Sequence, residues 1–420
     1  MRTKLTRVIL LAVIAVAISG ARARADVVQD WNAEALKVTF AVGPPQARAL
    51  AIVHIAMHDA INSITGRYDT YAVHHGSPPG ASPVAAGAAA AHHVLVNLFP
   101  QMTATYDQAL ATSLDGIAEP GRTDGMLVGQ EVGETILALR MNDGFSAPAS
   151  YTPGSGPGAW VPTPPAFAPA LLPGLGRVRP FALKSGSQFR PDGPPRLTGE
   201  RWASDLNEVQ TIGSVDAELL GLRTPEQTAT ARFWLGNMIP IMQRIAQQVS
   251  TARRLGLSAN ARFFALLNIV GADSYIAAWD AKYAYNFWRP VTAIQNADTD
   301  DNPDTIADPS WMPFGTTPPF PDYVSGHTAY TRASVEVLEE VFGRGHTAFV
   351  ATNPAVPPAE GTRRYSKFRE LSKEMIEARI LAGIHFRTAD RDGDRLGRDV
   401  AQFAVSHVLR SCRRESHEHR

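Results

Sequence analysis

Cysteine is almost absent from this 420-residue chain, and so is any imbalance of charge. Cys412 is the only cysteine in the sequence, so no internal disulfide can form. Lysine plus arginine and aspartate plus glutamate both number 40, which leaves no basic excess to suggest a nucleic-acid partner. An apolar content of 45% and a charged content of 19% are typical of a globular protein.

The sequence also lacks apolar runs long enough to cross a membrane, and its one short run stands at the start. Residues 1–25 combine basic side chains, an apolar core over 8–20 and small residues up to Ala25. This is the pattern of a secretory signal peptide, which is too short to span a bilayer. Cleavage after Ala25 would leave 35 basic and 40 acidic residues, a net charge of about −5. We therefore expect an exported protein, periplasmic or secreted, without a membrane span.

Strand-like alternation is scarce, whereas helical periodicity recurs along the chain. Helical patterns cover 47–64, 84–98, 123–141, 225–289, 325–343, 366–384 and about 394–410. The sequence therefore predicts an all-α protein built from packed helical bundles. We expect an N-terminal helical region over 26–145, a C-terminal helical region over 201–410 that carries the candidate site, and a loose tail over 411–420.

Residues 146–200 interrupt this pattern with a dense run of proline, glycine and aromatic residues. Proline excludes a regular helix here, and the segment is too apolar for a free linker. We interpret it as a long ordered crossover that packs over the protein. A second loop is expected over 296–324.

The stretch "PPFPDYVSGHTAY", residues 318–330, ends a turn-rich segment just where a helical pattern begins. Ser325 and Gly326 are typical of a helix start, whose free backbone N–H groups suit an anion. His327 would lie in the first turn, where it can give or take a proton near neutral pH. The alternative is an ordinary capped helix with a surface histidine.

The stretch "AKYAYNFWRP" places Lys282 and Arg289 seven residues apart. Two helical turns would bring them to one face, with Pro290 ending or kinking the helix. Lysine is a point charge and arginine a planar fork, so together they suit a tetrahedral oxyanion. A solvated basic face fits poorly, because the neighbouring aromatic residues indicate burial.

The stretch "EARILAGIHFRTADRDG" contains Arg379 and His385, six residues apart. In a straight helix they would point about 120° apart, but Gly383 can let the backbone turn. Arg379 would then be a further oxyanion contact and His385 a ligand or a nucleophile. A structural histidine near a helix end is the alternative.

Taken in order, Lys-x6-Arg-Pro, Ser-Gly-His and Arg-x5-His resemble the signature of the vanadium-dependent haloperoxidases and the type 2 phosphatidic acid phosphatase superfamily. The resemblance is to the soluble haloperoxidases and covers most of residues 30–410. It includes "IAMHDAIN", "DSYIAAWDAKYAYNFWRPVTAI" and the proline-rich middle.

The resemblance implies that His385 binds vanadium through a ring nitrogen and that His327 is the acid–base residue. It also implies a set of groups that hold the vanadate oxygens: Lys282, Arg289, Ser325, the amide of Gly326, and Arg379. Trp279 and Phe320 match positions that shape the halide pocket in the fungal chloroperoxidase-like members.

The sequence departs from the family pattern at two places. Val324 stands where a proline usually precedes Ser-Gly-His, and Ala378 stands where a serine usually precedes the arginine. Neither change removes a ligand, but loss of the serine could loosen the support of the site. The family also pairs the last arginine, here Arg379, with a carboxylate that the sequence does not locate.

The resemblance implies a vanadate-dependent enzyme that uses hydrogen peroxide to oxidise bromide, with chloride as a further option, for transfer to a small organic acceptor. Vanadate would act as a Lewis acid without changing its oxidation state. One alternative is a soluble periplasmic acid phosphatase, with phosphate in the site, His385 as the nucleophile and His327 protonating the leaving group. Another is a non-catalytic periplasmic oxyanion-binding protein.

Overall fold

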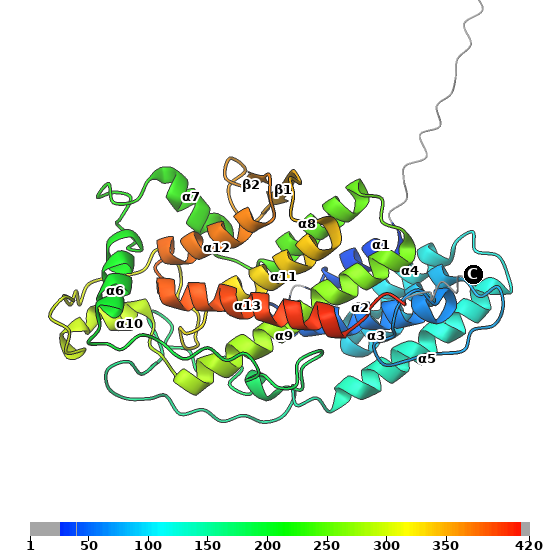
Figure 1. Cartoon of the computed structure of the whole chain (residues 1–420), viewed down its shortest axis with the longest axis horizontal. Coiled ribbons are helices and arrows are strands. Elements are labelled where there is room, and N and C mark those ends of the chain that lie inside the picture. Colours follow the sequence, from blue (N-terminus) through cyan, green and yellow to red (C-terminus); the bar gives the residue numbers. More distant parts are fainter. Residues whose placement is uncertain (1–25, 39, 413–420) are drawn as a thin grey trace, which may run out of the picture.

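Two long helices, α2 (Pro44–Thr65) and α9 (Leu257–Tyr285), lie against each other at the centre of the molecule. The computed structural model describes residues 26–412 except residue 39, so the predicted signal peptide and most of the predicted tail lie outside the described residues. Figure 1 shows α2 to α5 toward one end of an elongated molecule and α10 to α13 toward the other.

The all-α prediction is confirmed. The remaining helices of the described chain are α1 (Val27–Ala35), α3 (Pro83–Leu98), α4 (Thr103–Leu114), α5 (Gly121–Met141), α6 (Glu200–Ile212), α7 (Pro225–Trp234), α8 (Ile239–Ala252), α10 (Pro290–Gln295), α11 (Gly326–Phe342), α12 (Arg369–Leu381) and α13 (Arg387–His407). Short 3-10 turns η1 (Pro100–Met102), η2 (Leu175–Arg177) and η3 (Ala297–Thr299) join them, with one antiparallel pair of strands, β1 (Phe349–Thr352) and β2 (Thr362–Tyr365).

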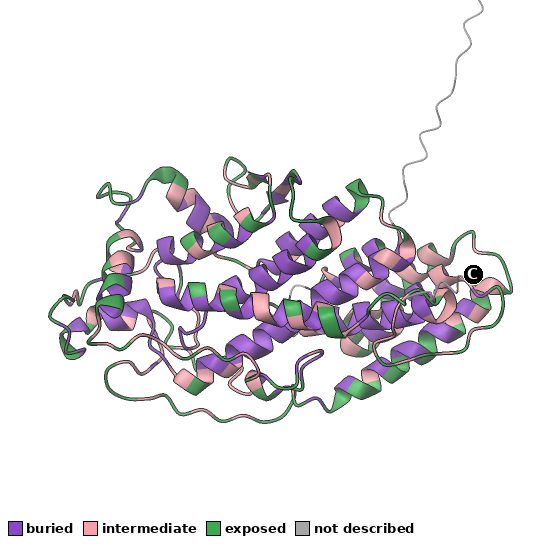
Figure 2. Cartoon of the chain, in the orientation of Figure 1, coloured by how far each residue is buried: buried purple, intermediate pink, exposed green. Residues whose placement is uncertain are grey.

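The core follows the central helices. Figure 2 shows buried residues concentrated on α2, α9 and α11, while the outer faces of α5 and α13 are exposed. Helix α9 is buried over most of its circumference, because neighbouring helices surround it. Within the described part of the chain, every helix is too short or too polar to span a bilayer.

Close helix pairs flank the centre on both sides. A side chain at Gly129 of α5 would collide with the backbone of α3 at Ala86, and one at Gly397 of α13 would collide with the backbone of α11 at Ala329. Only glycine permits this approach. The second pair matters for function, because it fixes α13 beside the first turns of α11.

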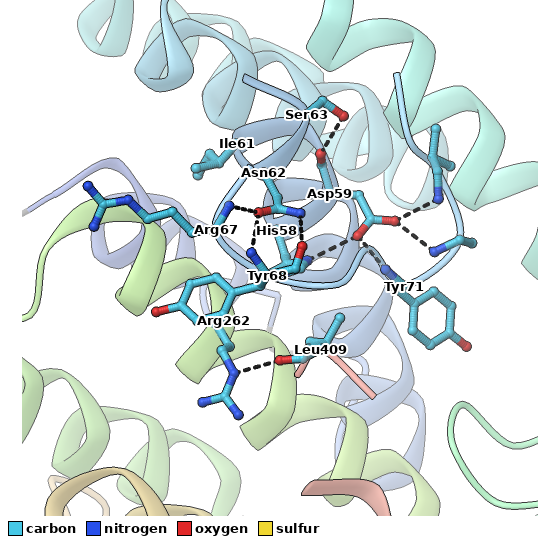
Figure 3. A network of polar contacts seen from close by, with 12 residues as sticks. His58, Asp59, Ile61, Asn62, Ser63, Arg67, Tyr68, Tyr71, Arg262 and Leu409 are labelled. Carbon is cyan, nitrogen blue, oxygen red and sulfur yellow. Dashed lines mark hydrogen bonds and ion pairs between the residues drawn. The ribbon is translucent and has the colours of Figure 1, made fainter. Parts of the chain in front are cut away.

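Buried aspartates on the two central helices hold the chain that returns to them. On α2, the Asp59 carboxylate accepts hydrogen bonds from the backbone N–H groups of Tyr71, Ala72 and Val73, at 2.7–3.0 Å (Figure 3). On α9, Asp273 accepts from three consecutive N–H groups of the proline-rich crossover over 181–183, also at 2.7–3.0 Å. The crossover is therefore ordered and packed on the protein, as the sequence predicted.

Several boundaries differ from the sequence predictions. The prediction of a helix that continues to Arg289 is wrong. Helix α9 ends at Tyr285, because Asn286 adopts a left-handed conformation (φ 51°). Residues 286–288 instead exchange backbone hydrogen bonds with the crossover at Gly158 and Trp160. Helix α13 begins earlier than predicted, and the sequence patterns missed α1, α4, α6, α10 and the β1–β2 pair.

Candidate active site

The three predicted motifs meet in one place between α9, α11 and α12. Lys282 lies in the last turn of α9, Arg289 directly precedes α10, and Arg379 lies in the last turn of α12. All three side chains are at most 1% exposed. Burying three cations together is unfavourable unless an anion or carboxylates offset the charge, so the arrangement points to an anion site rather than to a solvated basic face.

Lys282 and Arg289 converge, but not by the predicted route. They come from two separate elements, yet both cations lie over the ring of Phe320, with Lys282 Nζ 4.9 Å and Arg289 Cζ 4.8 Å from its centroid. Lys282 Nζ also donates to the carbonyl oxygens of Pro321 and Asp322, at 2.7 and 2.9 Å. The loop that precedes Ser-Gly-His therefore binds both cations.

Backbone carbonyl oxygens hold each arginine, and each keeps at least one buried donor without a partner. Arg289 donates through Nε to Phe320 O at 2.7 Å and through Nη1 to Ile384 O at 2.6 Å, while its buried Nη2 has no partner. Arg379 donates through Nη1 to Trp234 O at 2.9 Å, while its buried Nε has no partner. Leaving such a donor unsatisfied typically costs about 1–3 kcal/mol, so the site suits a ligand rich in acceptor oxygens.

The start of α11 adds a buried hydroxyl and the first amides of a helix. Ser325 precedes the helix, its backbone N–H donates to Ala389 O at 3.0 Å, and its side chain lies near the Asp390 carboxylate. A side chain at Gly326 would come within 3.0 Å of Trp279, so glycine keeps this turn close to α9. The first amides of a helix lack intrahelical acceptors and favour an anion.

His385 reaches the site because the chain turns sharply after α12. Gly383 has φ 74°, which supports the predicted turn at this residue. The ring of His385 is buried, with Nδ1 2.7 Å from Asp322 Oδ1 and Nε2 3.2 Å from Arg289 Nη1. Arg379 and His385 therefore contribute to one site, although they lie on different faces of a helical projection.

His327, in the first turn of α11, is the half-buried member of the group. Its Nε2 lies 3.2 Å from the carbonyl oxygen of Gly236, in the connection between α7 and α8. Burial lowers the pKa of His327 well below its ordinary value, and the positive charge of Arg379 lowers it further. The ring is therefore neutral near pH 7, and a hydrogen bond from Nε2–H to Gly236 would leave Nδ1 as a proton acceptor.

The pKa values of the other basic side chains of the site are also lowered. Burial and then Arg289 lower the pKa of Lys282 well below its usual value, and burial lowers the pKa values of Arg289 and Arg379 to about 10. For His385 the causes are burial and then Arg289 and Lys282. A bound oxyanion would oppose all four shifts, because its charge favours the protonated forms.

Sequence reasoning missed two buried carboxylates at the site. Asp322 lies three residues before Ser325, and burial raises its pKa to about 7 against the opposing charges of Arg289 and Lys282. Asp390 lies in the first turn of α13, and burial raises its pKa well above the usual range. A hydrogen bond from Ser325 and the charge of Arg379 act in the opposite direction. Asp390 is the carboxylate whose charge acts most strongly on the pKa of Arg379, but the two side chains form no ion pair within 4.0 Å.

Two aromatic residues form a wall beside the cations. The rings of Trp279 and Phe320 lie 4.8 Å apart between centroids. Trp279 Nε1 and Tyr283 Oη donate to the carbonyl oxygen of Leu171 in the crossover, at 3.2 and 2.7 Å. The crossover thus supports this wall. Val324 and Ala378, where the sequence departs from the family pattern, are both buried hydrophobic residues.

Comparisons with known proteins bear on the family and the fold. Residues 262–414 match the family model described as the VCPO second helical-bundle domain. Vanadium chloroperoxidase from Curvularia inaequalis is 23% identical over 481 residues, which cover 85% of this chain and 78% of that protein.

Solved structures share the fold. The first bacterial vanadium-dependent iodoperoxidase is similar with a TM-score of 0.78 and 24% identity, over 92% of this chain and 96% of that one. A bacterial vanadium-dependent chloroperoxidase in its holo form is similar with a TM-score of 0.70 and 16% identity, over 87% and 93% of the two chains.

The packed helical bundles of this chain are the fold of the vanadium-dependent haloperoxidases. Residues 262–414 match a domain of that family, and the curated relative is one of its peroxidase enzymes.

Proposed function

We propose that the protein is a vanadate-dependent haloperoxidase, which uses hydrogen peroxide to oxidise halide for transfer to a small organic acceptor. The observation that carries the proposal is the pair of buried guanidinium donors without partners, Arg289 Nη2 and Arg379 Nε, which come from two separate segments. Together with Lys282 and the helix start at Gly326, they suit a tetrahedral oxyanion.

Vanadate fits these residues. Lys282, Arg289, Ser325, Gly326 and Arg379 would hold its oxygens, and His385 Nε2 would bind vanadium. Bound vanadate supplies a Lewis acid for hydrogen peroxide without a change of oxidation state.

The protein's own residues supply charge stabilisation and proton transfer. Lys282 and the two arginines are held by carbonyls or lie over Phe320, so their charges are oriented before any ligand binds. His327 would take a proton from hydrogen peroxide at Nδ1 and return it, because Nε2 faces Gly236. The half-buried position of His327 suits exchange with entering molecules.

The halide is proposed to be oxidised beside Trp279 and Phe320. An apolar wall reduces screening and strengthens the effect of Lys282 and Arg289 on the reacting oxygen. Chloride is harder to oxidise than bromide and needs that stronger effect. We expect bromide oxidation and, at a lower rate, chloride oxidation; the relatives named for chloride and for iodide make iodide the natural third halide to measure.

Phosphatase activity is the second candidate, and one observation favours it. His385 is a buried imidazole whose pKa is lowered and which lies 3.2 Å from Arg289, so an unprotonated ring nitrogen is available beside the anion site as a nucleophile. A non-catalytic oxyanion-binding protein would bind phosphate or vanadate through the same residues and show no turnover.

One side-by-side assay separates these functions. The purified mature chain, with and without orthovanadate, is tested for peroxide-dependent bromination and for hydrolysis of a phosphomonoester. The proposal expects bromination only with orthovanadate, and inhibition of any hydrolysis by it. Hydrolysis without bromination would favour the phosphatase, and neither activity would favour the binding protein.

Export is part of the proposal, on the pattern of residues 1–25. Expression of the full chain in a Gram-negative host should give periplasmic protein that begins at Asp26. Intact mass measurement of that fraction checks the cleavage site, and an uncleaved cytoplasmic product would contradict export.

A further inference from the structure

We infer that the organic acceptor is an uncharged aromatic compound, which docks where the proline-rich crossover meets the aromatic wall of the site. The inference rests on the proposed function and names the substrate class of the same site. This acceptor surface consists of Leu171 in the crossover, Tyr283 on α9 and Phe320 in the loop before α11. All three side chains are partly or largely exposed, whereas the cations of the site are buried.

Backbone hydrogen bonds join Leu171 to the aromatic wall. Its carbonyl oxygen accepts from Trp279 Nε1 at 3.2 Å and from Tyr283 Oη at 2.7 Å. Its N–H donates to the carbonyl oxygen of Pro319 at 2.8 Å, and Pro319 directly precedes Phe320. The Leu171 side chain remains 44% exposed. The acceptor surface is therefore continuous with the place where the halide is proposed to be oxidised.

The backbone around Leu171 is held in an unfavourable conformation. Phe167 and Leu172 have φ 46° and 53°, a left-handed region that bulky side chains rarely adopt. Such residues persist where the surrounding structure fixes them, and they cluster at ligand sites. Phe167 is also largely exposed. The segment over 167–172 thus presents exposed apolar side chains on a backbone that is already ordered, which reduces the entropic cost of binding.

Both loops that meet at the acceptor surface lack charged side chains. Residues 145–176 and 309–321 contain no aspartate, glutamate, lysine or arginine, although these make up 19% of the chain. A charged acceptor would lose hydration at this surface without gaining a partner, because Lys282, Arg289 and Arg379 are buried. The surface therefore favours an uncharged acceptor.

The rings at the acceptor surface favour an aromatic acceptor. Tyr283 meets Tyr151 edge to face, at 5.0 Å between centroids, and Trp279 and Phe320 add two further rings. Aromatic rings stabilise one another in stacked and edge-on arrangements. An electron-rich ring is also what a hypohalous species attacks. A carbon–halogen bond forms, the ring C–H bond and the halogen–oxygen bond break, and the released proton and hydroxide leave as water.

Binding to the apo protein tests the surface without catalysis. The probes are 2-naphthol and its charged analogue 6-hydroxy-2-naphthoate, each titrated by calorimetry near pH 7. We expect 2-naphthol to bind more tightly than the naphthoate. Leu171→Ser keeps the backbone hydrogen bonds and removes the apolar side chain. It should weaken 2-naphthol binding about 3- to 10-fold, the effect of covering one partly exposed leucine.

Leu219→Ser is the matched control. Leu219 is a leucine in the connection between α6 and α7 with 87% of its surface exposed, and it lies outside the acceptor surface. This variant should bind 2-naphthol as the wild type does. Equal weakening in the two variants would overturn the inference, and so would equal affinity of the wild type for the two probes.

Competition during turnover links the surface to the reaction. The protein loaded with orthovanadate brominates an equimolar mixture of the two probes, and the product ratio is compared with that from reagent hypobromite. The wild type and Leu219→Ser should favour 2-naphthol beyond the reagent ratio, and Leu171→Ser should shift toward that ratio. A wild-type ratio equal to the reagent ratio would overturn the inference. Failure of the haloperoxidase proposal is separately visible, because 2-naphthol binding that depends on Leu171 without any bromination would contradict the activity and leave the acceptor surface intact.

Discussion

At the scale of single residues, the two histidines of the site have different surroundings and should have different functions. His385 is buried beside Asp322 and Arg289, whereas His327 is half-buried and faces a backbone carbonyl. The first suits a permanent ligand and the second suits proton transfer.

Alanine variants should separate these two functions. His385→Ala should abolish orthovanadate binding, because the bond to Nε2 is lost. His327→Ala should retain part of the binding and lose about 10²- to 10⁴-fold in turnover, the usual contribution of a positioned acid–base group. Vanadate titration with steady-state bromination measures both quantities, and equal loss of binding in the two variants would contradict the assignment.

Phe320 offers a test of the halide wall. Phe320→His replaces an apolar ring under Lys282 and Arg289 with a polar one that attracts water. Better screening should lower chloride oxidation more than bromide oxidation. The measurement is the ratio of the two rates in wild type and variant; an unchanged ratio would make Phe320 an ordinary core residue.

At the scale of elements, the position of α13 controls the geometry of the site. Gly397 lets α13 lie directly on the first turns of α11. This position brings Asp390 near Ser325 and Arg379. A larger side chain there should force the two helices apart.

Gly397→Val should therefore weaken both folding and anion binding. Overpacking of this kind costs about 1–3 kcal/mol, and the displaced Asp390 and Ser325 should also reduce phosphate affinity. Gly345→Val is the control, because a side chain there meets no other atom within 4 Å. Thermal unfolding and phosphate titration measure the two effects; a Gly397→Val protein that matches Gly345→Val in both would refute this account of α13.

Some helix boundaries and turns could be predicted from the sequence, and others could not. Local patterns predicted the helix that starts at Gly326 and the turn at Gly383, because capping and glycine chemistry are encoded within a few residues. They failed between Tyr285 and Arg289, where pairing with the distant crossover ends the helix. They also could not locate Asp390, since its place near Arg379 depends on how α13 packs against α11.

At the scale of the whole molecule, the site carries more positive charge than its two carboxylates offset. Lys282 and His385 have lowered pKa values without an anion, and an anion raises them again. Binding therefore takes up protons in the pH range between the free and the bound pKa values.

Anion affinity should fall as pH rises through that range. The sign follows from the direction of the shifts, because protonation favours the bound form and deprotonation favours the free form. Phosphate affinity measured by calorimetry in buffers of different ionisation enthalpy should show proton uptake, and Lys282→Met should reduce it. Affinity that rises with pH would contradict the charge assignment.

The central claim is that three separate segments build one vanadate site on His385. A crystal structure of the mature protein with orthovanadate tests it most directly. The account predicts vanadium bonded to His385 Nε2, with its oxygens contacting Lys282, Arg289, Ser325 and Arg379. Vanadium bound elsewhere, or an oxyanion at this site that does not approach His385, would contradict it.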